Sequence, residues 1–123
     1  KQMLGIPGVL FTYEPKLLGE SETIMSLKNW LEGEAFMVIY SDTLTELDYK
    51  KMIEYAKNYD APVLFWDKVM AGVSIYPKDY YKNPSKPTHP DWKDCVHYVT
   101  GDYWVDMGTW KGLREAQRHY KNN

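Results

Sequence analysis

Apolar residues in the first half of the chain follow two different spacings. Short runs rich in β-branched and aromatic residues at 9–13, 35–40 and 61–66 predict strands. Apolar residues at helical spacing between them predict two helices, one that starts near Ser21 and one that Thr45 caps. Because strands that alternate with helices form βαβ units, this pattern predicts a mostly parallel sheet covered by helices. The side chains expected on the inner faces of the helices are Ile24, Leu27, Leu31, Tyr49, Met52, Ile53 and Ala56.

The second half of the chain has a different pattern. Residues 72–76 alternate and predict a half-buried strand, whereas 77–94 are rich in Pro, Lys, Asp and Tyr and predict a long loop. Residues 95–99 and 103–106 predict two short strands joined by a hairpin turn. A last helix is predicted over 110–120.

Length and composition indicate one globular domain. The chain has 123 residues and a mass of 14.5 kDa, with 44% hydrophobic and 26% charged residues, which is ordinary for a single soluble domain. We therefore expect a three-layer α/β domain over 1–123, with βα repeats over 1–66. No apolar stretch is long enough to span a bilayer and no signal peptide is evident, so we expect no membrane partner.

Charge and cysteine content narrow the possible partners and surroundings. The formal net charge is -2, and no run of basic residues is present, which disfavours nucleic acid. The single cysteine, Cys95, forms no intramolecular disulfide, and with three dispersed histidines it does not make a structural zinc site. We expect a reducing, cytoplasmic setting.

Two aspartates occupy positions where ligands often bind. Asp42 follows the most apolar strand, and Asp106 ends a short strand just before the last helix. Open α/β sheets bind their ligands outside the carboxyl ends of their strands, and two converging carboxylates can hold a divalent cation. Asp42 can equally cap the following turn and Asp106 the last helix, because aspartate is favoured at such turns for local reasons. The spacing alone leaves both interpretations open.

Four segments together resemble one enzyme family. Residues 13–19 (YEPKLLG) and 36–48 (FMVIYSDTLTELD) resemble the YEPELLGTAG and FLVINGDTLTDLD motifs of sugar-1-phosphate nucleotidylyltransferases. Residues 71–76 (AGVSIY) are similar to the family's AGVYIY, and 103–109 (YWVDMGT) to its YWIDIGT. Because the motifs occur in the family's order, they are specific together although each alone is weak.

The resemblance implies a reaction and residues for it. In this family an oxygen of a sugar 1-phosphate attacks the α-phosphorus of a nucleoside triphosphate, and a metal ion neutralises the developing charge. By resemblance Asp42 and Asp106 hold Mg2+, and Lys68 steadies the sugar phosphate. From the sequence alone, Lys68 can also be a solvated surface lysine. Substrate contacts are implied for the residues in the other matching motifs, namely Glu14, Gly19, Tyr40 and Gly72.

The chain also departs from the family pattern. The family opens with a strand and a phosphate-binding loop of the type GGxGTRLxPLT, and nothing before Val9 resembles it. Glu20 and Glu22 stand where the family has small residues, and a carboxylate within about 4 Å of a phosphate costs roughly 1 to 4 kcal/mol. Residues 67–123 lack part of the family's sugar-binding region. The resemblance therefore implies the nucleotidylyltransferase fold without its N-terminal phosphate-loop unit.

These departures leave more than one functional class open. We expect a degenerate or partial relative that is inactive as an isolated chain, with a sugar 1-phosphate or a nucleotide as candidate partners. The first alternative is an active enzyme, completed by oligomerisation or by a partner that supplies the phosphate loop. The second is a binding or assembly module with an aromatic surface. Because the loss of the first strands exposes a sheet edge, we also expect a homo-oligomer.

Overall fold

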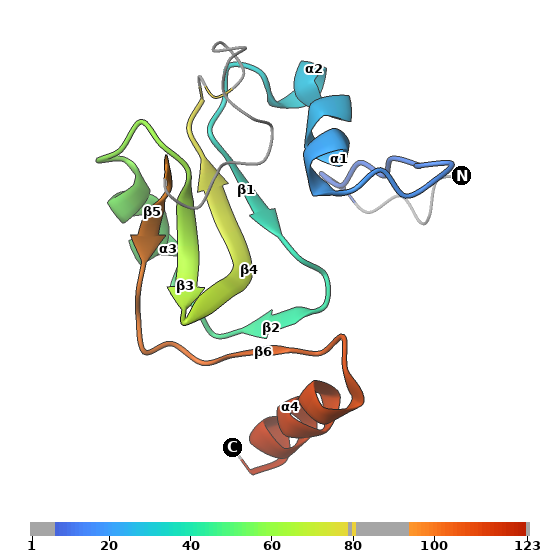
Figure 1. Cartoon of the computed structure of the whole chain (residues 1–123), viewed down its shortest axis with the longest axis vertical. Coiled ribbons are helices and arrows are strands. Elements are labelled where there is room, and N and C mark those ends of the chain that lie inside the picture. Colours follow the sequence, from blue (N-terminus) through green and yellow to red (C-terminus); the bar gives the residue numbers. More distant parts are fainter. Residues whose placement is uncertain (1–6, 79, 81–93, 123) are drawn as a thin grey trace.

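The computed structural model describes residues 7–78, 80 and 94–122, which form four helices and six strands (Figure 1). In chain order they are α1 (Glu20–Ser26), α2 (Lys28–Leu31), β1 (Phe36–Ile39), β2 (Thr43–Thr45), α3 (Tyr49–Ala56), β3 (Val63–Asp67), β4 (Val69–Tyr76), β5 (Val96–Tyr98), β6 (Trp104–Asp106) and α4 (Trp110–Asn122). Within this described part, no helix is both long and apolar enough to cross a membrane.

The main sheet is mixed. Its strand order is β1-β4-β3-β5, in which β4 runs antiparallel to both β1 and β3, and β5 runs parallel to β3. A tight turn at Lys68 joins β3 directly to β4, and such a short connection permits only antiparallel pairing. The α/β class is therefore confirmed, whereas the sheet is mixed instead of mostly parallel.

Helices cover the two faces of this sheet. Along β1 and β4, Met37 pairs with Ile75 on the face that Met52 of α3 covers. Phe36 pairs with Tyr76 on the opposite face, which α1 covers. Because side chains alternate between the faces of a strand, the two clusters form separate layers, and the expected three-layer arrangement is confirmed. The buried residues under α3 are Leu47, Met52, Val63, Phe65, Ala71, Val73 and Ile75, and those under α1 are Ile24, Tyr76 and Tyr80.

A second, two-stranded sheet consists of β2 and β6. It lies below the main sheet in Figure 1, with α4 beneath it. The predicted hairpin between the strands at 95–99 and 103–106 is wrong, because β5 pairs with β3 while β6 pairs with β2. The intervening residues instead connect the two sheets.

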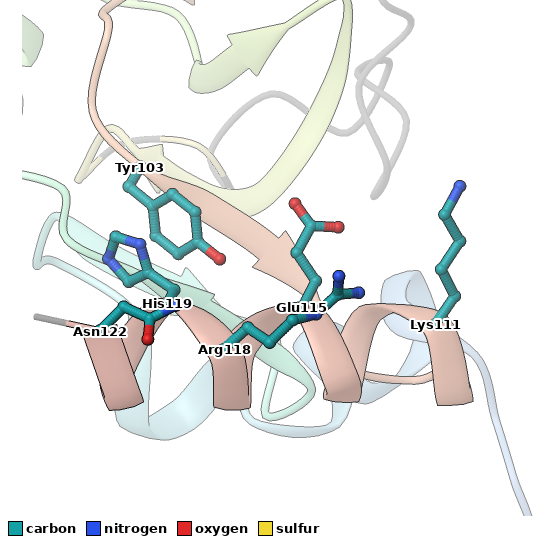
Figure 2. A pocket seen from close by; sticks show the side chains of 6 residues that line it. All are labelled: Tyr103, Lys111, Glu115, Arg118, His119 and Asn122. Carbon is teal, nitrogen blue, oxygen red and sulfur yellow. The ribbon is translucent and has the colours of Figure 1, made fainter.

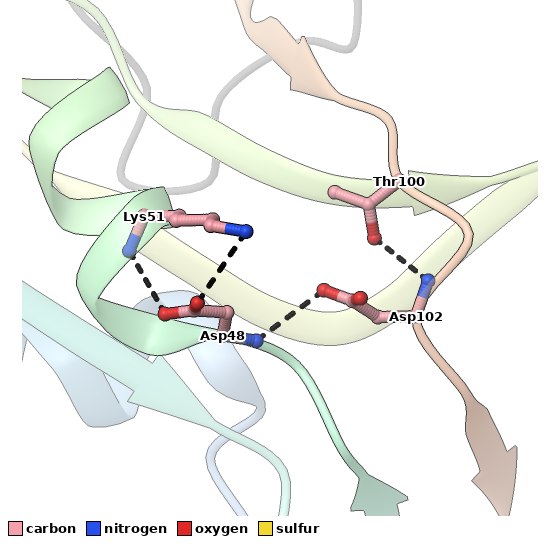
Figure 3. Close-up of polar contacts among 4 residues, drawn as sticks. All are labelled: Asp48, Lys51, Thr100 and Asp102. Atoms are coloured by element: carbon pink, nitrogen blue, oxygen red, sulfur yellow. Dashed lines mark hydrogen bonds and ion pairs between the residues drawn. The ribbon is translucent and has the colours of Figure 1, made fainter.

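Polar contacts hold this connection against α3 (Figure 3). The Thr100 hydroxyl accepts a hydrogen bond from the Asp102 backbone N–H at 3.0 Å, and the Asp102 carboxylate accepts one from the Asp48 N–H at 3.3 Å. Asp48 in turn accepts from the Lys51 N–H at 3.1 Å and caps α3. The predicted cap, Thr45, lies in β2 instead, where its hydroxyl accepts from the Leu47 N–H.

Other local predictions need correction. The helix predicted from Ser21 begins at Glu20 and is divided at Leu27 into α1 and α2. Residues 9–13 form no strand, because no described strand pairs with them and their side chains are largely exposed. The strand predicted as half-buried, β4, is central in the sheet and buried on both faces over most of its length. Ile53, expected to face the core, is largely exposed.

The predicted strands at 35–40 and 61–66 and the last helix are confirmed as β1, β3 and α4. Most of the long loop predicted over 77–94 lies outside the described residues.

Candidate functional site

The pairing of β2 with β6 brings Asp42 and Asp106 together. Thr43 and Asp106 are partners in the antiparallel ladder, and Asp42 directly precedes Thr43. The ladder continues for one more hydrogen bond, because the Met107 N–H donates to the Asp42 carbonyl oxygen at 2.7 Å. Two residues that lie 64 positions apart in the sequence therefore become neighbours at one end of this sheet.

The two carboxylates converge beside Gly108. Oδ2 of Asp42 and Oδ1 of Asp106 each lie 3.0 Å from the point that a Cβ on Gly108 would occupy. The Gly108 N–H donates to the same Asp106 oxygen at 2.7 Å. Because Gly108 has no side chain there, both carboxylates face a shared and solvent-exposed space.

This donor set fits magnesium. Mg2+ prefers oxygen ligands and is commonly bound by one or two carboxylates together with water and phosphate oxygens. Across residues 7–78, 80 and 94–122, no group of three or more His, Cys, Asp or Glu side chains is arranged to hold a metal ion. The site is thus a carboxylate pair that would leave most positions around an ion to water or phosphate.

The alternative interpretation, in which Asp106 caps the last helix, is wrong. Asp48 caps α3. At the start of α4, the Gly112 N–H donates to the Thr109 hydroxyl at 3.0 Å, so Thr109 is the capping residue. The Asp106 carboxylate makes a local turn with Gly108 and remains exposed.

Two glycines allow other elements to approach the strands that carry the aspartates. A Cβ on Gly112 of α4 would overlap the carbonyl oxygen of Asp106. A Cβ on Gly72 of β4 would overlap the hydroxyl of Thr43, and Gly72 also has a positive φ of 74°. Gly72, for which a substrate contact was expected, is buried against Thr43, and that contact stays a prediction.

The three remaining residues expected to contact substrate lie near α1 or at the end of β1. Glu14 accepts a hydrogen bond from the Thr23 hydroxyl, and Gly19 directly precedes α1. The Tyr40 hydroxyl donates to the Glu20 carboxylate. Burial and this bond raise the pKa of Tyr40 above its usual value. Glu20 thus has a hydrogen-bond partner within the chain, and its negative charge lies beside Tyr40 at the end of β1.

Lys68 lies in the turn between β3 and β4. It adopts a left-handed backbone conformation with φ of 63°, and its side chain is exposed. The preceding residue, Asp67, accepts a hydrogen bond from the indole N–H of Trp104 at 3.0 Å, which attaches the turn to β6. Lys68 therefore lies in a turn anchored to the strand that ends in Asp106, and its contact with a sugar phosphate stays a prediction.

One polar cluster was missed by the sequence analysis. Nε2 of His119 lies 2.7 Å from Oε1 of Glu46, and its ring stacks on Tyr103 with a centroid separation of 3.7 Å. Glu46 also donates a backbone hydrogen bond to the Tyr103 carbonyl oxygen. The residues lie far apart in sequence, so only the β2–β6 pairing reveals them. The cluster attaches the C-terminal half of α4 to both strands.

Solved structures confirm the fold that the motifs had implied. HddC from Yersinia pseudotuberculosis superposes with a TM-score of 0.67 at 22% identity, and its complex with GMP-PN with 0.68 at 21%. The chain has a sugar-1-phosphate nucleotidylyltransferase-like fold. A protein described as a glucose-1-phosphate thymidylyltransferase from Bacillus anthracis, in complex with a sucrose, superposes with a TM-score of 0.69 at 14% identity.

The nucleotidylyltransferase-like fold is only partly spanned by this chain. The comparison covers 87% of the chain and 64% of HddC, and 94% of the chain and 67% of the Bacillus anthracis protein. The chain therefore spans less than two thirds of HddC. No protein-family model and no curated protein sequence matches it.

Proposed function

We propose that Asp42 and Asp106 form a magnesium site that binds the phosphate groups of a nucleotide or sugar 1-phosphate. The observation that carries the proposal is the convergence of their carboxylate oxygens on one exposed point beside Gly108. An ion held there would neutralise charge on phosphate oxygens that would otherwise be repelled by the two carboxylates. The neighbour with GMP-PN and the neighbour with a sucrose support a nucleotide or a sugar as the organic part of the ligand.

We further infer that the isolated 123-residue chain does not catalyse nucleotidyl transfer. In phosphoryl and nucleotidyl transfer, positioning of the phosphate chain supplies much of the rate. The sequence holds no GGxGTRLxPLT motif that could cradle a triphosphate. Glu20 also remains beside Tyr40, where its charge disfavours an incoming phosphate. Turnover would then require phosphate-binding groups that these 123 residues do not contain.

Calorimetric titration with magnesium tests the site. We expect weak, saturable binding of Mg2+ to the unaltered chain and its loss in Asp42→Asn and in Asp106→Asn. Asp60→Asn is the matched control, because Asp60 is an exposed aspartate outside β2 and β6 and its removal changes the net charge equally. Identical binding in all four proteins would show that the carboxylate pair does not hold the ion.

An assay of pyrophosphate release tests the inferred inactivity. The isolated chain is incubated with magnesium, nucleoside triphosphates and several sugar 1-phosphates, and we expect no release above the protein-free rate. Release that disappears in Asp42→Asn would show that the isolated chain is an active enzyme. Release that persists in Asp42→Asn would point to a contaminating activity and leave the inference standing.

A further inference from the structure

A wide, open cavity lies apart from the two aspartates, between the start of β6 and α4 (Figure 2). Its volume is about 520 Å³, which is within the range of small-molecule sites. The lining residues are Tyr103, Lys111, Glu115, Arg118, His119 and Asn122. Tyr103 and Val105 alternate with Trp104 and Asp106 along the strand, so the cavity and the Asp106 carboxylate lie on different sides of β6.

Two cations, Lys111 and Arg118, and one carboxylate, Glu115, line this cavity, so its lining carries a net positive charge. Lys111 and Arg118 are two helical turns apart on α4, and Glu115 lies between them, one turn from each. Figure 2 shows Lys111 and Glu115 extending from the helix toward the same side. The neighbouring residues Arg114 and Lys121 add two more cations, and with Arg118 they line an adjoining hollow of about 360 Å³. This helix is therefore basic although the whole chain carries a net charge of -2.

A buried hydrogen-bond donor also faces this cavity. The Tyr103 hydroxyl is buried and has no hydrogen-bond partner among the described residues. Such a group is costly to leave unpaired, so it favours a ligand that brings an acceptor. In Figure 2 the hydroxyl is directed toward Glu115 and Arg118. His119 stacks on the Tyr103 ring and is itself held by Glu46, which fixes the direction of the hydroxyl.

We propose that this cavity binds a phosphate group, either a free inorganic anion or the phosphate of a small molecule. Arg118 and Lys111 pair with its charge, and the Tyr103 hydroxyl donates to one of its oxygens. A phosphate carries close to two negative charges at neutral pH and several strong acceptor oxygens, so it can pair with both cations although the Glu115 carboxylate lies between them. The planar arginine head group binds such oxygens in pairs.

Titrations followed by amide NMR test this proposal. The probes are inorganic phosphate, pyrophosphate and glucose 1-phosphate, in EDTA and at constant ionic strength, so that no magnesium links them to Asp42 and Asp106. We expect saturable shifts centred on Tyr103 and α4. Tighter binding of glucose 1-phosphate than of phosphate would assign the site to a phosphorylated small molecule, and the reverse order to a free anion. Absence of saturation with all three probes would overturn the proposal.

Variants separate the site from general surface charge. Arg118→Gln should weaken binding about tenfold or more, because a hydrogen bond to a charged group is lost, and Tyr103→Phe should weaken it severalfold. Lys50→Gln removes an exposed lysine of α3 and should leave binding unchanged. If Tyr103→Phe unfolds, Lys111→Gln on the exposed helix surface serves in its place. Equal weakening by Lys50→Gln and Arg118→Gln would overturn the proposal.

The same titrations distinguish this site from the proposed magnesium site. Binding should persist in the Asp42→Asn variant, because that carboxylate lies outside the cavity. Loss of phosphate binding in Asp42→Asn, with Arg118→Gln unaffected, would assign the anion to the aspartate site and refute the second one. Loss of magnesium binding has no bearing on a site measured in EDTA.

Discussion

Single glycines determine how closely α4 and β4 pack on the strands that carry the aspartates. Gly112 lies against the backbone of Asp106, and Gly72 lies against Thr43. At both positions the close neighbour is part of β2 or β6, so any added side chain must displace the element that positions a carboxylate. The geometry of the site therefore depends on how closely these two glycines let α4 and β4 pack.

Gly112→Ala tests this dependence. Alanine favours a helix interior over glycine by about 1 kcal/mol, yet here its Cβ would overlap the Asp106 carbonyl oxygen, and overpacking typically costs about 1 to 3 kcal/mol. We expect net destabilisation in chemical unfolding together with weaker magnesium binding. Gly101→Ala is the control, since no atom lies within 4 Å of its added Cβ. A Gly112→Ala protein more stable than the unaltered chain would show that α4 is not held this closely.

One buried tyrosine, Tyr76, and one half-buried tyrosine, Tyr40, predict a dependence of stability on alkaline pH. Burial raises the pKa of Tyr76, and the charge of Glu20 adds to the effect. Burial also raises the pKa of Tyr40. Because the folded chain holds these protons more tightly, the stabilisation is complete below the usual tyrosine pKa of about 10 and is lost as the pH rises above it.

Urea unfolding between neutral pH and pH 11 measures this loss. We expect the unfolding free energy to fall above about pH 10 and to fall less steeply in Tyr40→Phe, which lacks one of the tyrosines with a raised pKa. Tyr13→Phe replaces a highly exposed tyrosine and should leave the slope unchanged. Equal slopes in the unaltered chain, Tyr40→Phe and Tyr13→Phe would show that ionisation of Tyr40 does not cause the loss of stability.

At the scale of elements, β2, β6 and α4 form one structural unit. The two strands pair over three residues, Gly112 fits against the end of β6, and His119 contacts Glu46 and Tyr103 at the other end. Contacts at two separated points fix a helix more firmly than a contact at one. The His119 cluster is therefore expected to keep the C-terminal half of α4 on the strands.

Hydrogen exchange on His119→Ala measures this attachment. We expect faster exchange of the amides in the last two turns of α4, because local opening no longer breaks the contacts to Glu46 and Tyr103. His97→Ala removes a histidine that stacks on Trp66 instead and should leave α4 unchanged. Unaltered exchange in His119→Ala would mean that the apolar contacts of α4 alone hold it.

Local sequence signals predicted most elements but not their partners. Apolar runs placed β1 and β3 correctly because a buried strand needs such residues whatever pairs with it. The strand expected over 9–13 has equally suitable residues, yet a strand also requires a partner, and none of the described strands provides one. Thr45 was predicted to cap α3, but Asp48 caps it, because Thr45 lies in β2 and pairs with β6.

The candidate site was predictable only in part. The resemblance selected Asp42 and Asp106, and strand pairing then placed their carboxylates together. The phosphate cavity was not predictable, because Tyr103 and the cations of α4 have no characteristic spacing between them and meet only after β6 and α4 pack. Long-range packing of this kind is not encoded in any local pattern.

At the scale of the whole molecule, the main sheet has two edge strands, β1 and β5. Among the described strands, none pairs with the outer edge of β1. Ile39 on this strand is 49% exposed. A sheet edge without a strand partner that also carries an exposed apolar side chain favours association with another chain.

Sedimentation at micromolar concentration tests for this association. We expect species larger than the 14.5 kDa monomer, and we expect Ile39→Lys to reduce them, because a charge on an edge strand opposes strand pairing. Ile53→Lys places the same charge on α3, at a residue of similar exposure, and should have little effect. A single monomeric species for the unaltered chain would remove the support for oligomerisation through β1.

The pairing of Thr43 with Asp106 also makes the aspartate pair a property of the native state alone. In an unfolded chain the two carboxylates are 64 positions apart and would share no cation, so a magnesium ion bound by both would stabilise the folded chain by closing a long loop. At about ten times its dissociation constant the ion should add about 1.4 kcal/mol of stability, or a few degrees in the melting midpoint. Differential scanning calorimetry with and without magnesium should show this increment in the unaltered chain and not in Asp106→Asn. A melting midpoint that magnesium leaves unchanged in both proteins would mean that the ion does not stabilise the folded chain.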